Sequence, residues 1–454
     1  MERFSGLRAV VSGVVVAPGD PGYDAARAVA NPAVDRRPAA VVRCADSHDV
    51  AAVVRHAAEH GLGVAVRGGG QHVAGWGTCD DGIVADLGAL DCAWVDRAVA
   101  TVLAGPGLTW ERFDAATLPH GLAAPGGHGP AVGIAGYTLG GGIGELSRSI
   151  GLACDNVTAF ALVTAAGEHL RVTADSHPDL FWALRGGGGA FGVVTAFEFG
   201  LHPVTDIVCG PVVVRAAHAA DALRAARDWI GGAPDEASFA AVAWTAPPVP
   251  FVPEELHLEP CLVLFPSWCG HPDRAGRVLG PLRAALPPVV HDGVTRMPYA
   301  QYPGFFRRPP GLPHRAEYAR GELLRELDDR AVDELVAGWR SGGPAVSLVI
   351  GPLGGAIARV DPDATAFAHR EARWFVEVNA QWRPGTAGRE PLALVEDLWR
   401  GLGRVSVGPY VNLLPDSEPQ WARAAYSPAH LARLAAVKRA HDPENLFRYH
   451  AGAV

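Results

Sequence analysis

Three glycine-rich runs in the first two hundred residues carry the clearest chemical signal in the sequence. They occupy residues 68–70, 133–144 and 185–192, and each lies beside a predicted strand. Glycine lets the backbone approach a ligand closely or present N–H groups to an anion. One such loop could equally be a simple turn. Three together favour a ligand that contains a diphosphate.

The third run matches the GxGxxG spacing of dinucleotide-binding loops over residues 187–192. A Rossmann site needs a helix directly after this loop, but the following residues, 193–199, read as a strand. We therefore disfavour a Rossmann site. P-loop, HExxH and CxxC motifs do not occur in the sequence, and the histidines lack metal-ligand spacing, so no metal site is predicted.

Length and composition limit the classes of protein that the chain can form. Its 454 residues, 49% of them hydrophobic, can bury a large core in two domains or in one domain with an insertion. The net charge of -9 gives no reason to expect a nucleic-acid partner. Seven scattered cysteines and the lack of a signal-peptide layout or a span of membrane length predict a cytoplasmic protein without a membrane contact.

The elements expected around the glycine runs alternate between helix and strand. Ser47 can cap a helix that Gly61 ends, since its apolar residues recur at helical spacing. Further strands are predicted at 63–67, 82–87, 99–103 and 193–199, a hairpin at 159–173, and helices at 109–120 and 178–184. After Pro203 a second α+β region is predicted, with strands at 211–215, 239–244, 256–265, 345–350 and 374–381, a loop at 303–313 and a helix at 429–441.

Motifs in a fixed order give the sequence a family resemblance over nearly its whole length. They are VAVRGGG (64–70), AG (74–75), PGG (125–127), the run 136–144, GLACDN (151–156), DLFWALRGGGG (179–189), AYSPAHLARL (425–434), VK (437–438) and DPENLFR (442–448). In this order they resemble the berberine-bridge-enzyme-like oxidoreductases of the vanillyl-alcohol-oxidase superfamily. The resemblance implies an α+β fold. A PCMH-type FAD-binding domain built from residues 1–205 and 406–454 would be interrupted by a substrate domain, 206–405, whose antiparallel sheet is flanked by helices and roofs the flavin.

The same resemblance assigns residues to the cofactor site. One group would wrap the diphosphate, a second would run along the isoalloxazine, and the remainder would close the groove or lie near the pyrimidine edge. In that order the implied residues are Arg67, Gly68, Gly69, Gly70, Gln71, His72 and Gly75; Pro125, Gly126, Gly127 and Gly129; and Gly133, Gly136, Gly140, Gly141, Gly142, Asp155, Asn156, Val193, Val194, Tyr410, Asn412 and His450.

Two positions depart from the family pattern. Gln71 stands where relatives carry a histidine bonded to the flavin 8α-methyl, and Gly129 stands where doubly linked relatives carry a cysteine. Glutamine cannot form the link, and the adjacent His72 points the opposite way on an extended segment. We therefore predict noncovalent FAD, unless the loop is remodelled so that His72 substitutes. His450, where the family tends to carry asparagine, changes the same neighbourhood.

Candidate catalytic residues come from the C-terminal half of the chain. Hydride transfer from a substrate carbon to flavin N5 is assisted by a base that removes a nearby O–H or N–H proton. Tyr426 resembles a tyrosine base of several relatives, although it could equally be a packing aromatic. Glu377 and Asn379 share one face of strand 374–381, which is either a solvent-facing surface or, by the resemblance, a substrate surface.

These features lead to two functional hypotheses. The first is an FAD-dependent oxidase or dehydrogenase of an alcohol, a sugar or an intermediate of secondary metabolism, with Tyr426 as base and Glu377 assisting. Molecular oxygen or another acceptor would reoxidise the flavin, and the protein would be a monomer or homodimer. The second is an isomerase, cyclase or binding scaffold on the same fold with no net redox step. Bleaching of bound flavin by substrate would distinguish the two.

Overall fold

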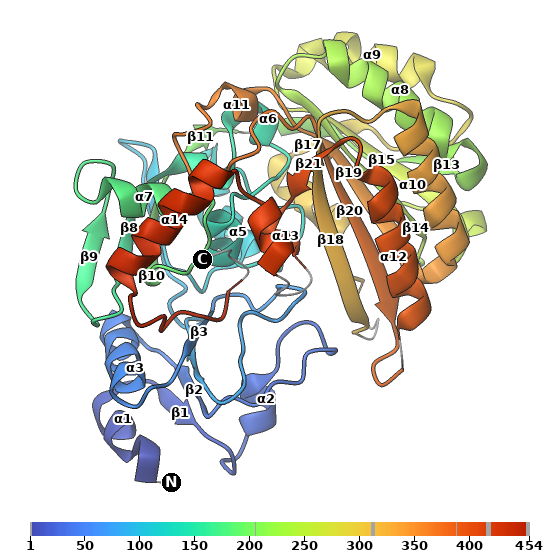
Figure 1. The fold of residues 1–454 in the computed structure, drawn as a ribbon. Coiled ribbons are helices and arrows are strands. Elements are labelled where there is room, and N and C mark those ends of the chain that lie inside the picture. The colour runs from blue at the N-terminus through green and yellow to red at the C-terminus, as the bar shows by residue number, and fades with distance from the viewer. Residues whose placement is uncertain (1, 205, 310–313, 387, 415–418, 451–454) are drawn as a thin grey trace.

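The chain forms two halves that lie side by side and are joined through several segments (Figure 1). The computed structural model describes residues 2–204, 206–309, 314–386, 388–414 and 419–450. The first half holds the N-terminal two hundred residues together with the last helix, α14 (Pro428–His441). The second half holds a large antiparallel sheet. Within the described residues, no helix is long and apolar enough to cross a membrane.

Two sheets form the framework of the first half. In the first, the order is β1-β2-β4-β3, and the pairs β2–β4 and β4–β3 are parallel. Parallel strands that are covered on both faces form near-continuous apolar runs, which matches the first three residues of AVVR, IVAD and VAVR. The bounds are β1 (Val14–Val16), β2 (Ala40–Arg43), β3 (Val64–Arg67) and β4 (Ile83–Asp86), with β5 (Ala93–Asp96), β6 (Thr101–Ala104), β8 (Val157–Val163), β9 (His169–Val172) and β10 (Val193–Gly200) in the second sheet.

The helices of the first half include the three that the sequence predicted, α3, α4 and α7. The full set is α1 (Ser5–Val10), α2 (Tyr23–Arg27), α3 (Ser47–Glu59), α4 (Trp110–Thr117), α5 (Ile134–Leu139), α6 (Ser147–Ile150) and α7 (Pro178–Ala183). The predicted cap of α3 was wrong by one residue. The side chain of Asp46 accepts hydrogen bonds from the backbone N–H groups of His48 and Asp49, so Ser47 is already helical. A carboxylate in the cap position satisfies these otherwise unpaired donors.

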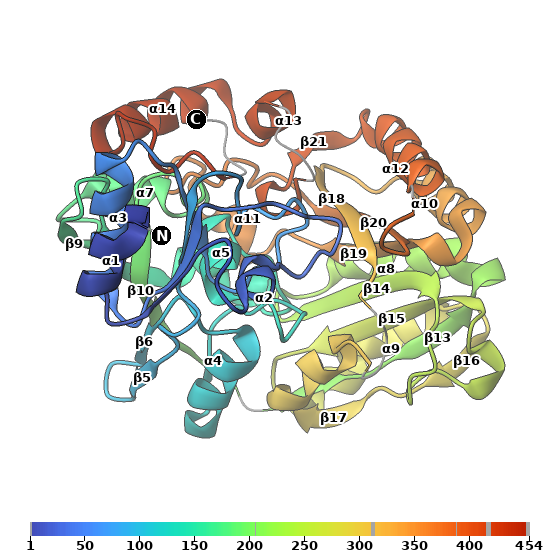
Figure 2. The same cartoon turned by 90° about the horizontal axis from the view of Figure 1, so that it is seen from below.

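The second half is organised around the largest sheet. Its described strands follow the order β16-β13-β15-β14-β19-β20-β18-β21, with β12 and β17 beside them, and its pairs are antiparallel. Alternation along β20 sends Trp374, Val376, Val378 and Ala380 into a core that they share with the helices. Figures 1 and 2 show these helices together on the outer face of the sheet. The helices are α8 (Ala219–Gly232), α9 (Ala275–Ala285), α10 (Asp329–Gly342) and α12 (Arg389–Leu402).

Most strands predicted for this region exist, but with different ends. The segment predicted as a strand from 256 begins later, because residues 254–256 form a short 3-10 helix. Part of the predicted 303–313 loop is also 3-10 helix, Tyr299–Phe306, and 310–313 lie outside the described residues. The strands are β12 (Asp206–Cys209), β13 (Val212–Arg215), β14 (Ala237–Thr245), β15 (Pro260–Trp268), β16 (Val289–Asp292), β17 (Thr295–Pro298), β18 (Ala316–Leu324), β19 (Val346–Pro352), β20 (Trp374–Trp382) and β21 (Ser406–Pro409).

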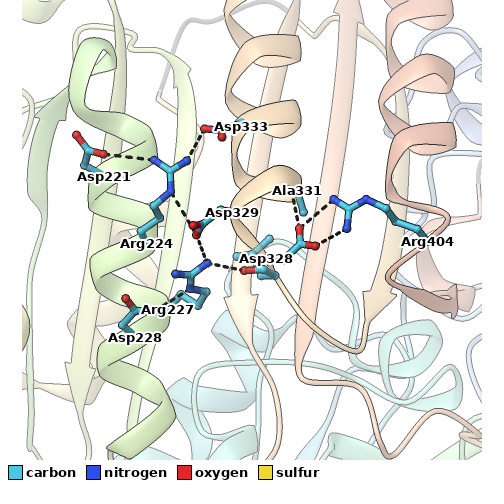
Figure 3. A network of polar contacts seen from close by, with 10 residues as sticks. Asp221, Arg224, Arg227, Asp228, Asp328, Asp329, Ala331, Asp333 and Arg404 are labelled. Carbon is cyan, nitrogen blue, oxygen red and sulfur yellow. Dashed lines mark hydrogen bonds and ion pairs between the residues drawn. The ribbon is translucent and has the colours of Figure 1, made fainter.

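Arginine–aspartate contacts link the outer helices (Figure 3). Arg227 of α8 reaches Asp329 of α10 at 2.6 Å, and Arg224 of α8 reaches Asp333 of α10 at 2.5 Å. Arg404 contacts Asp328, the cap of α10, through both guanidinium nitrogens. Exposed pairs contribute only about 0–1 kcal/mol each. The contacts therefore contribute little to the free energy of unfolding, and their main effect is on the relative position of the helices.

The C-terminal segment closes over the first half. Helix α14 packs against α7, and the chain then continues towards β3. Lys438 of α14 is the only lysine in the sequence. Its buried ammonium group donates to the carbonyls of Ala190 at 2.9 Å and Phe447 at 3.0 Å, and to the Asp442 carboxylate at 2.7 Å. One side chain therefore fastens the third glycine run to the end of the chain.

Candidate active site

A cavity of about 1330 Å³ opens between loops of the first half and the inner face of the large sheet. Pockets for a single drug-sized ligand are about 300–1,000 Å³. The cavity therefore has room for a dinucleotide and a further small molecule. Loops 68–72, 127–133 and 188–192 form one wall, and β18, β19 and β20 contribute to the opposite wall.

Glycine is required where the first two loops meet. A Cβ atom on Gly69 would lie 2.7 Å from the backbone nitrogen of Gly133, and one on Gly133 would lie 2.6 Å from the nitrogen of Gly69. Gly70 adopts a φ of 63°, which disfavours other residues. The two backbones therefore contact each other directly and line the cavity without side chains. This arrangement fits a bound diphosphate.

Three buried polar atoms at this wall have no hydrogen-bond partner among the described residues. They are Nε2 of His72, Nε1 of Trp76 and the hydroxyl of Tyr137, and all three residues line the cavity. A buried donor without a partner is costly, about 1–3 kcal/mol. Polar groups of a bound flavin nucleotide would satisfy these atoms. Together with the glycine contacts, they show that the residues present fit the cofactor predicted from the sequence.

The residues predicted for the site divide into two groups. The cavity wall includes Gly68, Gly69, Gly70, Gln71, His72, Gly127, Gly129, Gly133, Gly136, Gly140, Val194, Glu377, Tyr410, Asn412 and His450. Outside the described cavity wall lie Arg67, Gly75, Pro125, Gly126, Gly141, Gly142, Asp155, Asn156, Val193, Asn379 and Tyr426.

Several residues of the second group have clear structural partners. Arg67 donates to the carbonyl of Ala26 at 2.6 Å and to Asp86 at 2.8 Å, so its guanidinium holds the N-terminal segment. Asn156 donates its amide hydrogens to the carbonyls of residues 150 and 152. Asp155 receives two hydrogen bonds from Arg370, at 2.6 and 2.8 Å. These three side chains organise loops around the cavity instead of lining it.

Because Asp155 and Arg370 are both buried, the pair makes a testable contribution to stability. We expect Asp155→Asn to lower the free energy of unfolding by about 3–5 kcal/mol, since it leaves a buried guanidinium without its carboxylate. Thermal unfolding of the flavin-free protein measures this loss. If that protein keeps its stability while flavin binding weakens, Asp155 acts on the cofactor and not on the fold.

Tyr426 lies apart from the other predicted catalytic residues. Its side chain is buried, and its hydroxyl donates to the carbonyl of Gly186 at 3.1 Å. Burial also raises the pKa of the phenol. A tyrosine in this position packs between the C-terminal segment and the third glycine run. The structure does not bring it to Glu377.

Glu377 of β20 is enclosed by the cavity wall. Burial raises the pKa of its carboxyl to about 7, and the nearby charge of Glu317 adds to this rise. A hydrogen bond from the Asn379 side chain opposes it, as does the charge of His128 when that imidazole is protonated. Glu317 of β18 is half-buried, and this burial raises the pKa of its carboxyl, while its hydrogen bond with Gln381 lowers it. Near neutral pH, Glu377 can therefore both accept and release a proton.

The loop at the missing covalent position is well defined. The side chain of Gln71 is exposed to the cavity, whereas His72 is half-buried. Burial lowers the pKa of the His72 imidazole to about 4, so the ring is neutral. Its Nδ1 accepts a hydrogen bond from the backbone N–H of Ala74 at 3.2 Å. The ring is therefore held by its own loop at Ala74, and it lies beside the backbone of Val411.

Aromatic residues complete the cavity on the side of the large sheet. Sequence reasoning did not single them out, because aromatic residues of a ligand wall and of a core follow the same pattern. Glu317 was missed for a related reason: no strand was predicted at β18. The additional lining residues are Trp244, Phe251, Phe265, Phe305, Phe306 and Glu317.

A glycine-walled cavity under an antiparallel sheet, with a carboxyl of raised pKa at its wall, fits a flavin-dependent oxidoreductase. The chain matches the family model described as FAD binding domain over residues 38–173 and the one described as Berberine and berberine like over residues 409–452. It belongs to the berberine-bridge-like FAD-linked oxidoreductases. The family, α+β fold and FAD cofactor predicted from the sequence are confirmed, and the chain catalyses FAD-dependent oxidation of a small organic molecule.

Relatives match almost the full chain. (R)-6-hydroxynicotine oxidase of Paenarthrobacter nicotinovorans is 30% identical over 97% of this chain and 96% of its own. The FAD-linked oxidoreductase YvdP of Bacillus subtilis is 30% identical with 97% coverage of both. The crystal structure of 6-hydroxy-D-nicotine oxidase from Arthrobacter nicotinovorans superposes with a TM-score of 0.86 at 28% identity, covering 98% of each chain. Xylooligosaccharide oxidase from Myceliophthora thermophila, at 22% identity, shares the fold with a TM-score of 0.87.

Proposed function

We propose that the enzyme oxidises a substrate that carries an O–H or N–H group next to the C–H bond that is broken, with Glu377 as the proton acceptor. The observation that carries this proposal is the enclosed Glu377 carboxyl at the cavity wall, whose pKa burial raises to about 7. Bound FAD supplies the hydride acceptor. The ionised carboxylate of Glu377 takes the O–H or N–H proton, and Asn379 holds that carboxylate in place.

The cavity wall also indicates the substrate class. Phe251, Phe265, Phe305 and Phe306 form a continuous set of ring contacts with centroid separations from 4.9 to 5.8 Å. Such a wall favours an apolar ring over a strongly hydrated sugar, because burying hydroxyl groups without partners is unfavourable. Among the predicted alternatives, a ring-bearing intermediate of secondary metabolism fits this wall best.

The proposal also divides the chain by task. Residues 1–205 and 406–454 would hold the cofactor, and residues 206–405 would carry the substrate face. Supporting this division, the glycine loops of the wall come from the first range, and Glu317, Glu377 and the phenylalanines come from the second. Strand β21 joins the large sheet although it follows residue 405, so the two parts share a strand at that boundary.

The function is tested by anaerobic mixing with a panel of cyclic alcohols, cyclic amines and oligosaccharides. We expect bleaching of the 450 nm flavin band by ring-bearing compounds, followed by hydrogen peroxide when air is admitted. Product formation without bleaching would contradict hydride transfer. Bleaching by oligosaccharides alone would contradict the assigned substrate class while leaving the redox function intact.

Noncovalent FAD gives a separate prediction. Acid precipitation should release the yellow cofactor into the supernatant, because Gln71 cannot bond the flavin and His72 is held within its loop by Ala74. A yellow pellet would show that His72 or another residue forms the link. The matched variant Gln71→His restores a histidine at that position. If the flavin methyl group lies beside residue 71, this variant should retain colour in the pellet.

A further inference from the structure

A second acid–base pair lies at the cavity, apart from Glu377. Nε2 of His128 lies 3.3 Å from Oε2 of Glu145. Glu145 is buried and also accepts hydrogen bonds from the hydroxyls of Ser267 on β15 and Tyr302. An ionised carboxylate is purely an acceptor, and here it is surrounded by three donors. The arrangement fits a fixed carboxylate that orients His128.

The orientation of His128 leaves one ring nitrogen available. With Nε2–H donated to Glu145, Nδ1 becomes the acceptor in the neutral ring. Nδ1 has no hydrogen-bond partner among the described residues, and His128 lines the cavity. The His128 side chain is 28% exposed, whereas that of Glu145 is 1% exposed. The imidazole therefore lies between a buried anion and accessible space.

Glu377 needs a neighbouring group that can take up its proton. If it accepts a proton in each turnover, as proposed above, it must lose that proton before the next one. Burial of its carboxyl in the cavity wall, beside Asn379 and Glu317, hinders direct transfer of that proton to bulk water. His128 and Glu377 line the same cavity, His128 from loop 127–133 and Glu377 from β20.

We propose that His128, held by Glu145, is the proton relay between Glu377 and solvent. This inference rests on the proposed function. The proton on the Glu377 carboxyl passes to Nδ1 of His128, directly or through a water molecule, which leaves a carboxylate and an imidazolium. The imidazolium then releases that proton from Nδ1 to water or a buffer base, and both groups return to their starting states. No electrons move in either step.

Packing alone does not account for this arrangement. The ring of His128 contacts Phe306 at 4.9 Å and Tyr302 at 6.0 Å between centroids. Another planar side chain could make these contacts. The groups in contact with His128 are Glu145 from the loop before α6 and Tyr302 and Phe306 from their 3-10 helix, and Glu377 of β20 lines the same cavity. A buried carboxylate held by two further donors is a costly feature for a ring that only fills space.

The relay is tested with His128→Gln and His128→Ala in anaerobic single-turnover mixing. One signal is bleaching at 450 nm and the other is proton release, followed with an indicator dye at low buffer concentration. We expect proton release to slow by about tenfold or more, and bleaching to slow much less. Added imidazole should restore release in His128→Ala, where the cavity has space for it, and should change the unmodified enzyme little.

The His128→Gln variant keeps a hydrogen-bond donor for Glu145. If His128→Ala does not fold, the rates of proton release and bleaching are therefore compared in His128→Gln. Glu145→Gln should slow release by a smaller factor without imidazole rescue, as expected of a positioning residue. His257→Ala, which removes another half-buried histidine, should not respond to imidazole.

Unchanged proton release in both His128 variants would overturn the relay. So would bleaching slowed as severely as release, because His128 would then be the primary base. If no substrate bleaches the unmodified enzyme, the proposed function itself fails, and that result does not depend on any His128 variant.

Discussion

Replacing Glu377 with glutamine slows flavin reduction by about 10²–10⁴-fold, the usual range for loss of a positioned base, while FAD stays bound. Glutamine keeps the size of the side chain and its hydrogen-bonding contact with Asn379. The cavity shape is therefore preserved. Rapid mixing at 450 nm measures the rate, and the flavin content of the purified variant shows that the cofactor site is intact.

The same assignment predicts in which direction the rate of flavin reduction changes with pH. Burial raises the pKa of Glu377 to about 7, and the ionised form is the proton acceptor. The rate of reduction should therefore rise as the pH increases through about 7 and then level off. This rise should be lost in Glu377→Gln.

Glu317 provides a matched control. It is a second carboxyl at the cavity, half-buried on the neighbouring strand, with Gln381 as its partner. Glu317→Gln should slow reduction far less than Glu377→Gln. It should also lower the apparent pKa of the profile, because Glu317 contributes to the raised pKa of Glu377. Equal losses in both variants would contradict the assignment of the base to Glu377.

The second large effect is expected from Gly69→Ala. The new methyl group would lie 2.7 Å from the backbone nitrogen of Gly133, and neither backbone can move without opening the cavity wall. We expect destabilisation by about 1–3 kcal/mol, the usual cost of overpacking, together with loss of most bound FAD. The ratio of absorbance at 450 nm to that at 280 nm and the melting temperature measure the two effects.

Two alanine variants separate these effects. At Gly280 in α9 a Cβ atom meets nothing within 4 Å, so Gly280→Ala should keep both flavin content and stability. At Gly136 the Cβ atom also has open space, but that space is the cavity. Gly136→Ala should therefore weaken flavin binding without destabilising the flavin-free protein. Full flavin content in Gly69→Ala would show that the contact between the loops is not needed for the cofactor.

The sequence predicted the glycine loops and the polar face of β20 well, because both follow from local requirements. Residues 69 and 133 are glycines because a side chain on either one would collide with the backbone of the other loop. Such a requirement appears in the sequence as a glycine-rich run. Glu377 faces the cavity because alternation along a strand is strict. Helix α3 was also predicted, since its buried residues recur at helical spacing.

Other features depend on contacts that no sequence pattern records. Asp155 and Tyr426 stand in motifs that border the cavity, yet Arg370 and the carbonyl of Gly186 determine where their side chains point. Strand β18 was missed because its sequence, AEYARGELL, places charged residues along a central strand. Glu317 lines the cavity, Glu322 accepts a hydrogen bond from Ser406, and the guanidinium of Arg320 lies over the ring of Trp399. The contact between His128 and Glu145 joins two loops, and no helix or strand periodicity in the sequence indicates it.

The buried hydrogen bonds of Lys438 have a practical consequence for studying this enzyme. Since the chain has one lysine, amine-directed acylation has a single side-chain target. That amine makes three hydrogen bonds while the closing segment is in place, and burial lowers its pKa. Acylation then requires local opening of the segment, so the labelling rate reports how often the end of the chain detaches. The mass shift of the peptide that contains Lys438, which peptide mapping separates from acylation of the N-terminal amine, would thus follow a motion at the cofactor wall without any engineered probe.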